Sequence, residues 1–188
     1  MKAPPGEPLW EVLKTYHWTQ TFPARKALHI RHEYQPSTGF AEMRVDEIAP
    51  SFRKKRLADL KSNRDKSLTW TMNLYQKLDN ACVDPSVQRE LTSQAGRNHT
   101  PEEDVLFFAW VDYILTTANS WQTPIKDFTL IVDRKPDQRS AVAPEYISFC
   151  WDGPIKKVDA EHFLVHKTNF IPKKELQVAF LGLISDEH

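Results

Sequence analysis

Glycine is scarce in this sequence, and the short motifs that mark common enzyme classes are missing. The 188 residues include only 5 glycines, which leaves little material for loops that cradle phosphate groups. The chain has no G-x-S-x-G, S-x-x-K or H-E-x-x-H motif, no P-loop and no dinucleotide-binding fingerprint. These absences argue against serine hydrolases, zinc proteases and nucleotide-dependent enzymes. They do not exclude a hydrolase with a carboxylate pair, because such a pair has no local signature.

An excess of charge of either sign is also missing. The 25 Lys and Arg residues balance 25 Asp and Glu residues, so the chain lacks the overall positive field that supports non-specific binding to nucleic acid. No nucleic-acid partner is therefore expected. The longest apolar runs, such as Val105–Val111, are far shorter than the ~18 residues of a membrane span. No membrane span is expected either.

Cysteine is limited to Cys82 and Cys150, which permit at most one internal bridge. Their spacing matches no zinc motif, and the residues alone leave open whether the thiols pair or pack separately as small hydrophobic groups. His162 and His166 lie on one face of a strand pattern but about 13 Å apart, too far for one ion. No metal and no cofactor is expected.

Alternation of apolar and polar residues, the pattern of half-buried strands, recurs along the chain. The first two strands would form a hairpin around a turn at Phe22–Arg25. Strands at short intervals predict an α+β fold, mostly β: an antiparallel β-sandwich with one or two short helices, in a single domain over residues 1–188. The strands are expected at residues 10–22, 28–34, 106–117, 127–133, 146–151, 162–166 and 176–183.

Helical signals are fewer. Asp84 and Pro85 are typical of a helix start, because Asp84 can accept from the first free amides and Pro85 lacks an N–H that would need a partner. They predict a helix over residues 85–95. Residues 41–66 are expected to form a short surface helix or a mobile polar excursion, with the basic run 53–56 as a solvated face rather than a phosphate site. Residues 67–80 fit either a helix or a strand.

Two of the six tryptophans are the candidate ligand-binding residues. Trp121 follows a turn and Trp151 precedes one, each beside polar residues. Aromatic rings at strand ends can stack on sugars or peptides, although packing in a core is the usual role of tryptophan. No residue is assigned a catalytic role.

Several stretches, spread over almost the whole chain, carry a family resemblance. In order they are Tyr16-x-Trp18-x-x-x-Phe22-Pro23-Ala24, His32-x-Tyr34-x-Pro36-Ser37, Cys82-Val83-Asp84, Tyr113-Ile114-Leu115-Thr116-Thr117-Ala118-Asn119-x-Trp121, Asp127-Phe128-x-Leu130-x-Val132-Asp133, Ser148-Phe149-Cys150 and Phe170-x-Pro172-x-x-x-Leu176. Together they resemble the bacterial domain-of-unknown-function family 4424.

The resemblance implies a β-rich bacterial protein that is periplasmic or secreted and has no assigned activity. An oxidising compartment favours a Cys82–Cys150 disulfide. Family members usually begin with a signal peptide and a further β-rich portion, so this chain is expected to be the C-terminal part of a longer protein. The strand near Trp10 would then expose an edge through which two copies could associate.

Three functional hypotheses follow. The first is a non-catalytic extracytoplasmic binding or envelope-structural module, and the alternative is a hydrolase that acts on an envelope polymer through a carboxylate pair. The third is a subunit that is completed only by its missing N-terminal half. Two carboxyl groups about 5–9 Å apart in a cleft would favour the hydrolase. A shallow aromatic patch or an open sheet edge would favour binding.

Overall fold

The computed structural model describes residues 17, 19–33, 36, 38–95, 104–133, 145–159 and 162–184. Contacts divide the chain into two units, residues 1–35 and residues 36–188. The described residues of the first unit are exposed and include a turn at Ala24 and Arg25, as expected, but no strand. The strands expected at 10–22 and 28–34 are therefore wrong for the described residues 17, 19–22 and 28–33, because apolar alternation forms a strand only where a partner strand and a core are available. Trp10 and the edge expected there lie outside the described residues.

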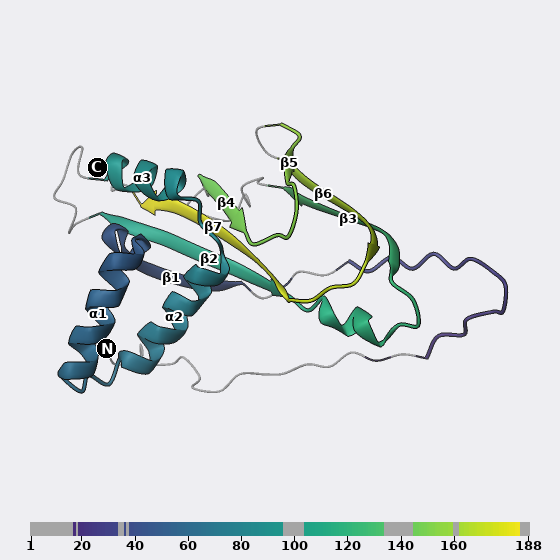
Figure 1. Ribbon diagram of the computed structural model, residues 1–188, viewed down its shortest axis with the longest axis horizontal. Helices are drawn as coiled ribbons and strands as arrows, with labels where there is room; N and C mark the ends of the chain where they lie inside the picture. Colours follow the sequence, from purple (N-terminus) through teal and green to yellow (C-terminus); the bar gives the residue numbers. More distant parts are fainter. Residues whose placement is uncertain are drawn as a thin grey trace. The chain divides into compact units, whose positions relative to one another are not determined.

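Two antiparallel sheets form the frame of the second unit (Figure 1). Sheet A has the strand order β1 (Gly39–Arg44), β2 (Val105–Tyr113), β7 (Leu176–Ile184) and β4 (Tyr146–Phe149). Sheet B has the order β3 (Ile125–Asp133), β6 (His162–Phe170) and β5 (Lys156–Lys157). The predicted antiparallel α+β sandwich is confirmed.

The described residues also form three α-helices and two 3-10 helices. They are η1 (Val45–Ile48), α1 (Pro50–Ser62), α2 (Leu68–Asn80), α3 (Pro85–Gln94) and η2 (Thr116–Ser120). The prediction of α3 is confirmed with its cap, because the Ser86 amide donates to the Asp84 carboxylate at 2.7 Å. The Ser86 hydroxyl also donates to this carboxylate, and the hydroxyl bond together with the amide bond holds the pKa of Asp84 below its usual range.

The segment that fitted either a helix or a strand is the helix α2. Thr71, Leu74, Tyr75 and Leu78 are its buried residues, and their spacing is the stripe that a helix presents to a core. Trp70 and Met72, whose alternation suggested a strand, are exposed at 62% and 52%. Burial of the helical stripe therefore decided between the two patterns.

The polar segment 41–66, expected as a short surface helix or a mobile polar excursion, contains the end of β1, then η1 and α1. The helix was expected and the strand was not. Strand β1 is short, and it pairs with β2 so that Gly39 lies opposite Trp110. A Cβ atom on Gly39 would come within 2.1 Å of the Trp110 ring. Glycine at this position therefore lets β1 approach its neighbour.

The helices cover one face of sheet A. Phe108 of β2 and Leu181 of β7 stand in one row of this face and are fully buried, together with Leu91 of α3. The same cluster includes Leu74 and Leu78 of α2. This face is a closed core in which helices and sheet share one set of buried side chains.

Sheet B packs against the opposite face of sheet A. Val178 of β7 and Phe149 of β4 lie opposite one another in sheet A and cluster with Val132 of β3 and Val165 of β6. Since residues along a strand alternate between faces, β7 contributes Ala179 and Leu181 to one core and Leu176 and Val178 to the other. Strand β7 is thus the shared wall of two cores.

A disulfide joins the helical layer to the edge of sheet A. Cys82 follows α2 and Cys150 follows β4, and the structure joins them with a Cα–Cα distance of 5.0 Å. Beside this bridge, the Ser148 hydroxyl donates to the Ala81 carbonyl at 2.9 Å. The expected Cys82–Cys150 disulfide is present.

Candidate binding cleft

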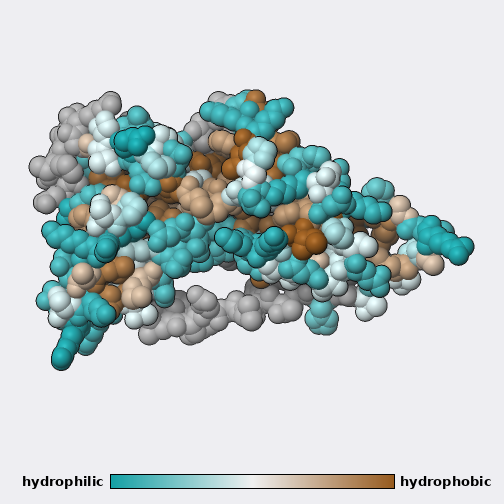
Figure 2. Space-filling view, viewed as in Figure 1, coloured by the Kyte–Doolittle hydropathy of each residue, from teal (hydrophilic) through white to brown (hydrophobic). Residues whose placement is uncertain are grey.

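An apolar cleft of about 300 Å³ lies between the two sheets. Ten of its twelve lining residues are aliphatic or aromatic, and the two others are Thr129 and Asp133. Figure 2 shows hydrophobic residues at the surface in the middle of the view, between hydrophilic regions. The full lining set is Val111, Tyr113, Leu115, Phe128, Thr129, Leu130, Ile131, Val132, Asp133, Leu176, Val178 and Phe180.

The two walls of the cleft are built differently. Sheet A contributes alternate residues of one face, such as Val111 and Tyr113 of β2 and Leu176 of β7. Strand β3 contributes six consecutive residues, 128–133, and therefore both of its faces. No residue of β6 or β5 lines the cleft, so sheet B borders it through β3 alone. Since β6 occupies one edge of β3, the cleft follows the other edge.

A glutamate fixes the connection between β2 and β3 at this cleft. The Glu175 carboxylate, just before β7, accepts from the hydroxyl of Thr116 and from the amides of Leu115 and Thr116, at 2.6 and 3.2 Å. The Thr116 hydroxyl bond and these amide bonds hold the pKa of Glu175 below its usual range. Leu115 is thereby held in place as a lining residue.

The two candidate tryptophans differ in their surroundings. Trp151 is half-buried in an aromatic cluster, with its ring centroid 5.8 Å from that of Phe128 and 5.5 Å from that of Phe170. The Lys167 ammonium lies 5.5 Å from the centroid of the Trp151 ring. Trp151 therefore contributes to the core between the sheets, and through Phe128 it supports one wall of the cleft.

Trp121 is exposed at 63% and directly follows η2. Among the described residues, no ring contact joins it to Trp151. Their ligand-binding role stays a prediction.

His162 and His166 lie on one face of β6, as the alternation indicated, and each has a carboxylate partner. His162 Nδ1 lies 2.8 Å from Asp159, and its Nε2 lies 3.6 Å from Asp133. His166 Nε2 lies 3.3 Å from Asp127 of β3. In the part of the chain that the structure describes, no group of three or more His, Cys, Asp or Glu side chains is placed to hold a metal ion.

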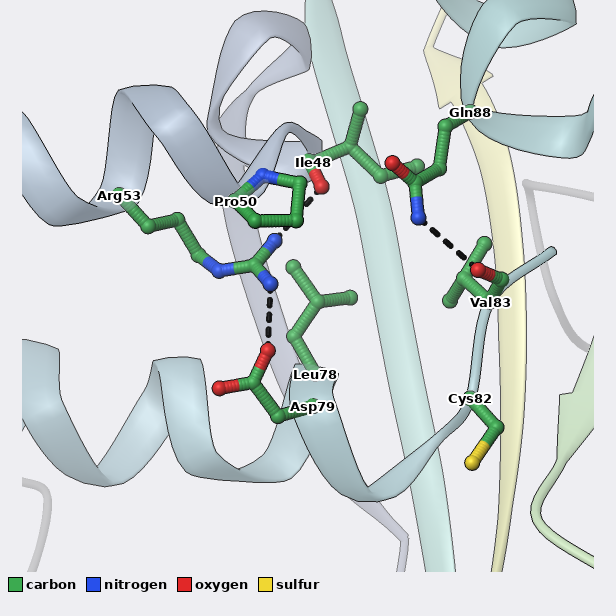
Figure 3. Close-up of a pocket in the computed structure, with 8 residues that line it drawn as sticks. All are labelled: Ile48, Pro50, Arg53, Leu78, Asp79, Cys82, Val83 and Gln88. Atoms are coloured by element: carbon green, nitrogen blue, oxygen red, sulfur yellow. Dashed lines mark hydrogen bonds and ion pairs between the residues drawn. The ribbon is translucent and has the colours of Figure 1, made fainter. Parts of the chain in front are cut away.

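A second, smaller cavity of about 120 Å³ lies between η1, α1, α2 and α3 (Figure 3). The Arg53 guanidinium crosses it, donating to the carbonyls of Glu47 and Ile48 at 3.1 and 2.6 Å and to the Asp79 carboxylate. Arg53 is only 7% exposed. The first residue of the basic run is therefore buried and hydrogen-bonded, and it is not part of a solvated face. The remaining three basic residues, 54–56, are exposed.

Tyr75 completes the polar cluster beside this cavity. Its hydroxyl donates to the Glu47 carboxylate at 2.6 Å, and its ring lies 5.9 Å from the Arg53 guanidinium. Burial, followed by the hydrogen bond and charge of Glu47, raises the pKa of Tyr75. This cluster joins η1, α1 and α2, and its groups satisfy one another, which is typical of a structural network.

Each of these two cavities has a single carboxylate in its lining, Asp79 in the smaller and Asp133 in the apolar cleft. Neither therefore has the pair of carboxyl groups that the hydrolase hypothesis requires. Among the described helices, none combines the length and apolarity needed to cross a bilayer.

The sequence indicated part of this cleft. Alternation in β3 placed Phe128, Leu130 and Val132 on one face, and the structure confirms that these residues point between the sheets. Sequence reasoning missed the edge position of β3. No local signal encodes it, because an edge strand and a central strand can have the same pattern.

Comparison with known proteins agrees with the sequence motifs. The model of a family described as a domain of unknown function, DUF4424, matches residues 2–179. No curated protein matches the chain. No solved structure matches it.

Proposed function

The chain belongs to the DUF4424 family, and we propose that it is a non-catalytic binding module that takes an apolar group into the cleft between its sheets. The cleft carries this proposal. Ligand pockets are typically concave, mostly apolar and at least about 300 Å³ in volume, and this cleft has those properties. The closed core on the other face of sheet A is built from other residues than those that line the cleft.

The proposal extends to the compartment. A bacterial periplasmic or secreted location is supported by the Cys82–Cys150 bridge, because disulfides persist in oxidising compartments. The thiols of protein isolated from its native cells can be titrated after denaturation without reductant. We expect no free thiol, and two freely reactive thiols would contradict this location.

The test of the binding site uses N-phenyl-1-naphthylamine, an uncharged apolar dye that fluoresces away from water. We expect saturable binding to the native protein, weakened by Leu130→Asn because the variant places an amide in the apolar lining. Met72→Asn is the matched control, since Met72 is exposed on α2, outside the cleft lining. Circular dichroism and thermal melting are the checks that both variants fold.

Two outcomes would contradict the proposal. One is dye binding that Leu130→Asn leaves unchanged in the folded protein. The other is an equal loss in both variants, which would indicate adsorption to exposed apolar side chains in general.

A further inference from the structure

We infer that the occupant of the cleft is an extended polypeptide segment that adds a strand to the edge of β3 that no described strand occupies, and that it has a basic residue at each end. This inference rests on the proposed function, since it names the ligand class of the same cleft. It is carried by three features of β3: its hydrogen-bonding edge, its uncharged middle and its acidic ends.

The edge of β3 supplies hydrogen-bonding groups along the cleft. Among the described residues, β3 pairs with β6 and with no other strand. In an antiparallel pair, alternate residues direct their N–H and C=O groups away from the partner strand. Because the cleft follows this edge over residues 128–133, a chain lying in the cleft can both pair with β3 and place side chains against sheet A.

The middle of β3 lacks the devices that usually protect an exposed edge. Edge strands are commonly blocked by charged residues, proline or a bulge. Residues 128–132 read Phe-Thr-Leu-Ile-Val, with no charge and no proline, and they pair with β6 in unbroken register. Ile131 is 61% exposed. This stretch is therefore suited to accept another strand.

Both ends of this stretch are acidic. Asp127 and Asp133 are six residues apart and so lie on the same face of β3, with side chains 71% and 41% exposed. His166 and His162 contact them at 3.3 and 3.6 Å, but a carboxylate has lone pairs for more than one donor. The nearest basic residue of the strand, Lys126, belongs to the opposite face. The edge thus favours a partner with a cation at each end.

The same charges disfavour a second copy of β3 as the partner. In the antiparallel self-pairing centred on Leu130, Asp127 of each copy lies opposite Asp133 of the other. Like charges directly opposite across two strands are destabilising. Charge complementarity therefore points to a different segment, with Lys or Arg opposite each aspartate.

The register specifies the partner further. Residues opposite Phe128, Leu130 and Val132 point toward sheet A and should be apolar, whereas those opposite Thr129 and Ile131 face outward. The matching seven-residue pattern is basic, apolar, variable, apolar, variable, apolar, basic. It is symmetric, so the charges match in either chain direction.

The probe is the fluorescein-labelled peptide Lys-Val-Thr-Val-Thr-Val-Lys, titrated with the native chain by fluorescence anisotropy. We expect saturable binding. Two isomers, N-methylated at the odd or at the even residues, test for strand pairing because only one set of amides can donate to β3. One isomer should lose roughly a hundredfold in affinity while the other changes little, and equal effects of the two would overturn the inference.

A charge exchange tests the register. Asp127→Lys should weaken binding of the lysine-ended peptide roughly fivefold and strengthen that of the matching glutamate-ended peptide. Asp59→Lys, an exposed site on α1, is the control and should change neither. A response to Asp59→Lys that equals the response to Asp127→Lys would show non-specific attraction and overturn the inference.

Failure of this inference differs from failure of the proposed function. Leu130-dependent dye binding with no binding of any peptide would overturn the strand addition and leave an apolar ligand site. Absence of both would overturn both. Sedimentation of the chain alone tests whether a second copy of the chain is the occupant. A dimer that the peptide dissociates would show β3 pairing with itself and would overturn the inference of a different segment.

Discussion

The two faces of sheet A differ in how completely they are covered. On the helical face, Leu91, Leu106, Phe108 and Leu181 are fully buried. On the face toward sheet B, Phe180 and Leu130 are only half-buried and border a cleft of about 300 Å³. Both faces belong to the same four strands, and each contributes buried apolar residues to a core. The faces differ in the number and placement of their covering elements, and the incompletely covered face is the one available to a ligand.

The largest effect is expected from truncating a side chain in the closed core. Phe108→Ala should lower the free energy of unfolding by about 3–5 kcal/mol, because it removes a fully buried ring and leaves a cavity. Phe128→Ala in the cleft is the comparison, and about 1–2 kcal/mol is expected because that ring is half-buried. Urea unfolding followed by circular dichroism measures both. Equal losses would remove the distinction between the two faces.

The next effect tests how firmly the helical layer is attached. Replacing both Cys82 and Cys150 by Ala should lower the free energy of unfolding by about 2–4 kcal/mol, because the bridge closes a sequence separation of 68 residues. Reductant should bring the wild-type protein to the same value and leave the double variant unchanged. Ser148→Ala, beside the bridge, removes one hydrogen bond to Ala81 and should cost about 1 kcal/mol. A wild-type protein insensitive to reductant would contradict the role of the bridge.

The smallest effect concerns three hydrogen-bonded carboxylates and the pH dependence of the stability that they contribute. The pKa values of Asp84, Asp65 and Glu175 are lowered in the folded chain, chiefly by hydrogen bonds from Ser86, Ser67 and Thr116. A lowered pKa means that the folded state binds fewer protons than the unfolded state, so this stabilisation is present above about pH 4 and is lost as the pH falls through the lowered values.

The urea midpoint of the wild-type protein should therefore fall between about pH 5 and pH 3. Asp84→Ala should lower the midpoint at the higher pH and reduce its fall with acid, since it removes the cap of α3. Asp59→Ala, an exposed residue within α1, is the control. An Asp84→Ala protein with the wild-type pH dependence would contradict the assignment.

Local patterns predicted the elements whose sequence and environment agree. The cap at Asp84 and Pro85 located α3, and the alternation at Phe128, Leu130 and Val132 located β3 and its inward face. Where two patterns coexist, local reasoning could not choose. Trp70 and Met72 alternate on a helix whose other face is buried, and only the core beneath α2 distinguishes these roles.

The basic run at residues 53–56 shows a similar limit for a single residue. Its side chains are alike in the sequence, but Arg53 alone reaches the carbonyls of Glu47 and Ile48. Its partners come from η1 and α2, up to 26 residues away. A buried arginine is stable only where such acceptors surround it, and a sequence does not show which acceptors will meet.

The amino-acid sequence by itself determined the β-rich class, the capped start of α3 and the inward residues of β3, because each depends on side chains a few positions apart. The tertiary structure alone decided that β3 is an edge strand and that sheet B leaves a cleft beside it. Strand order and the spacing of packed sheets depend on contacts between distant segments, and the free energy of those contacts is not encoded in any short stretch of the chain.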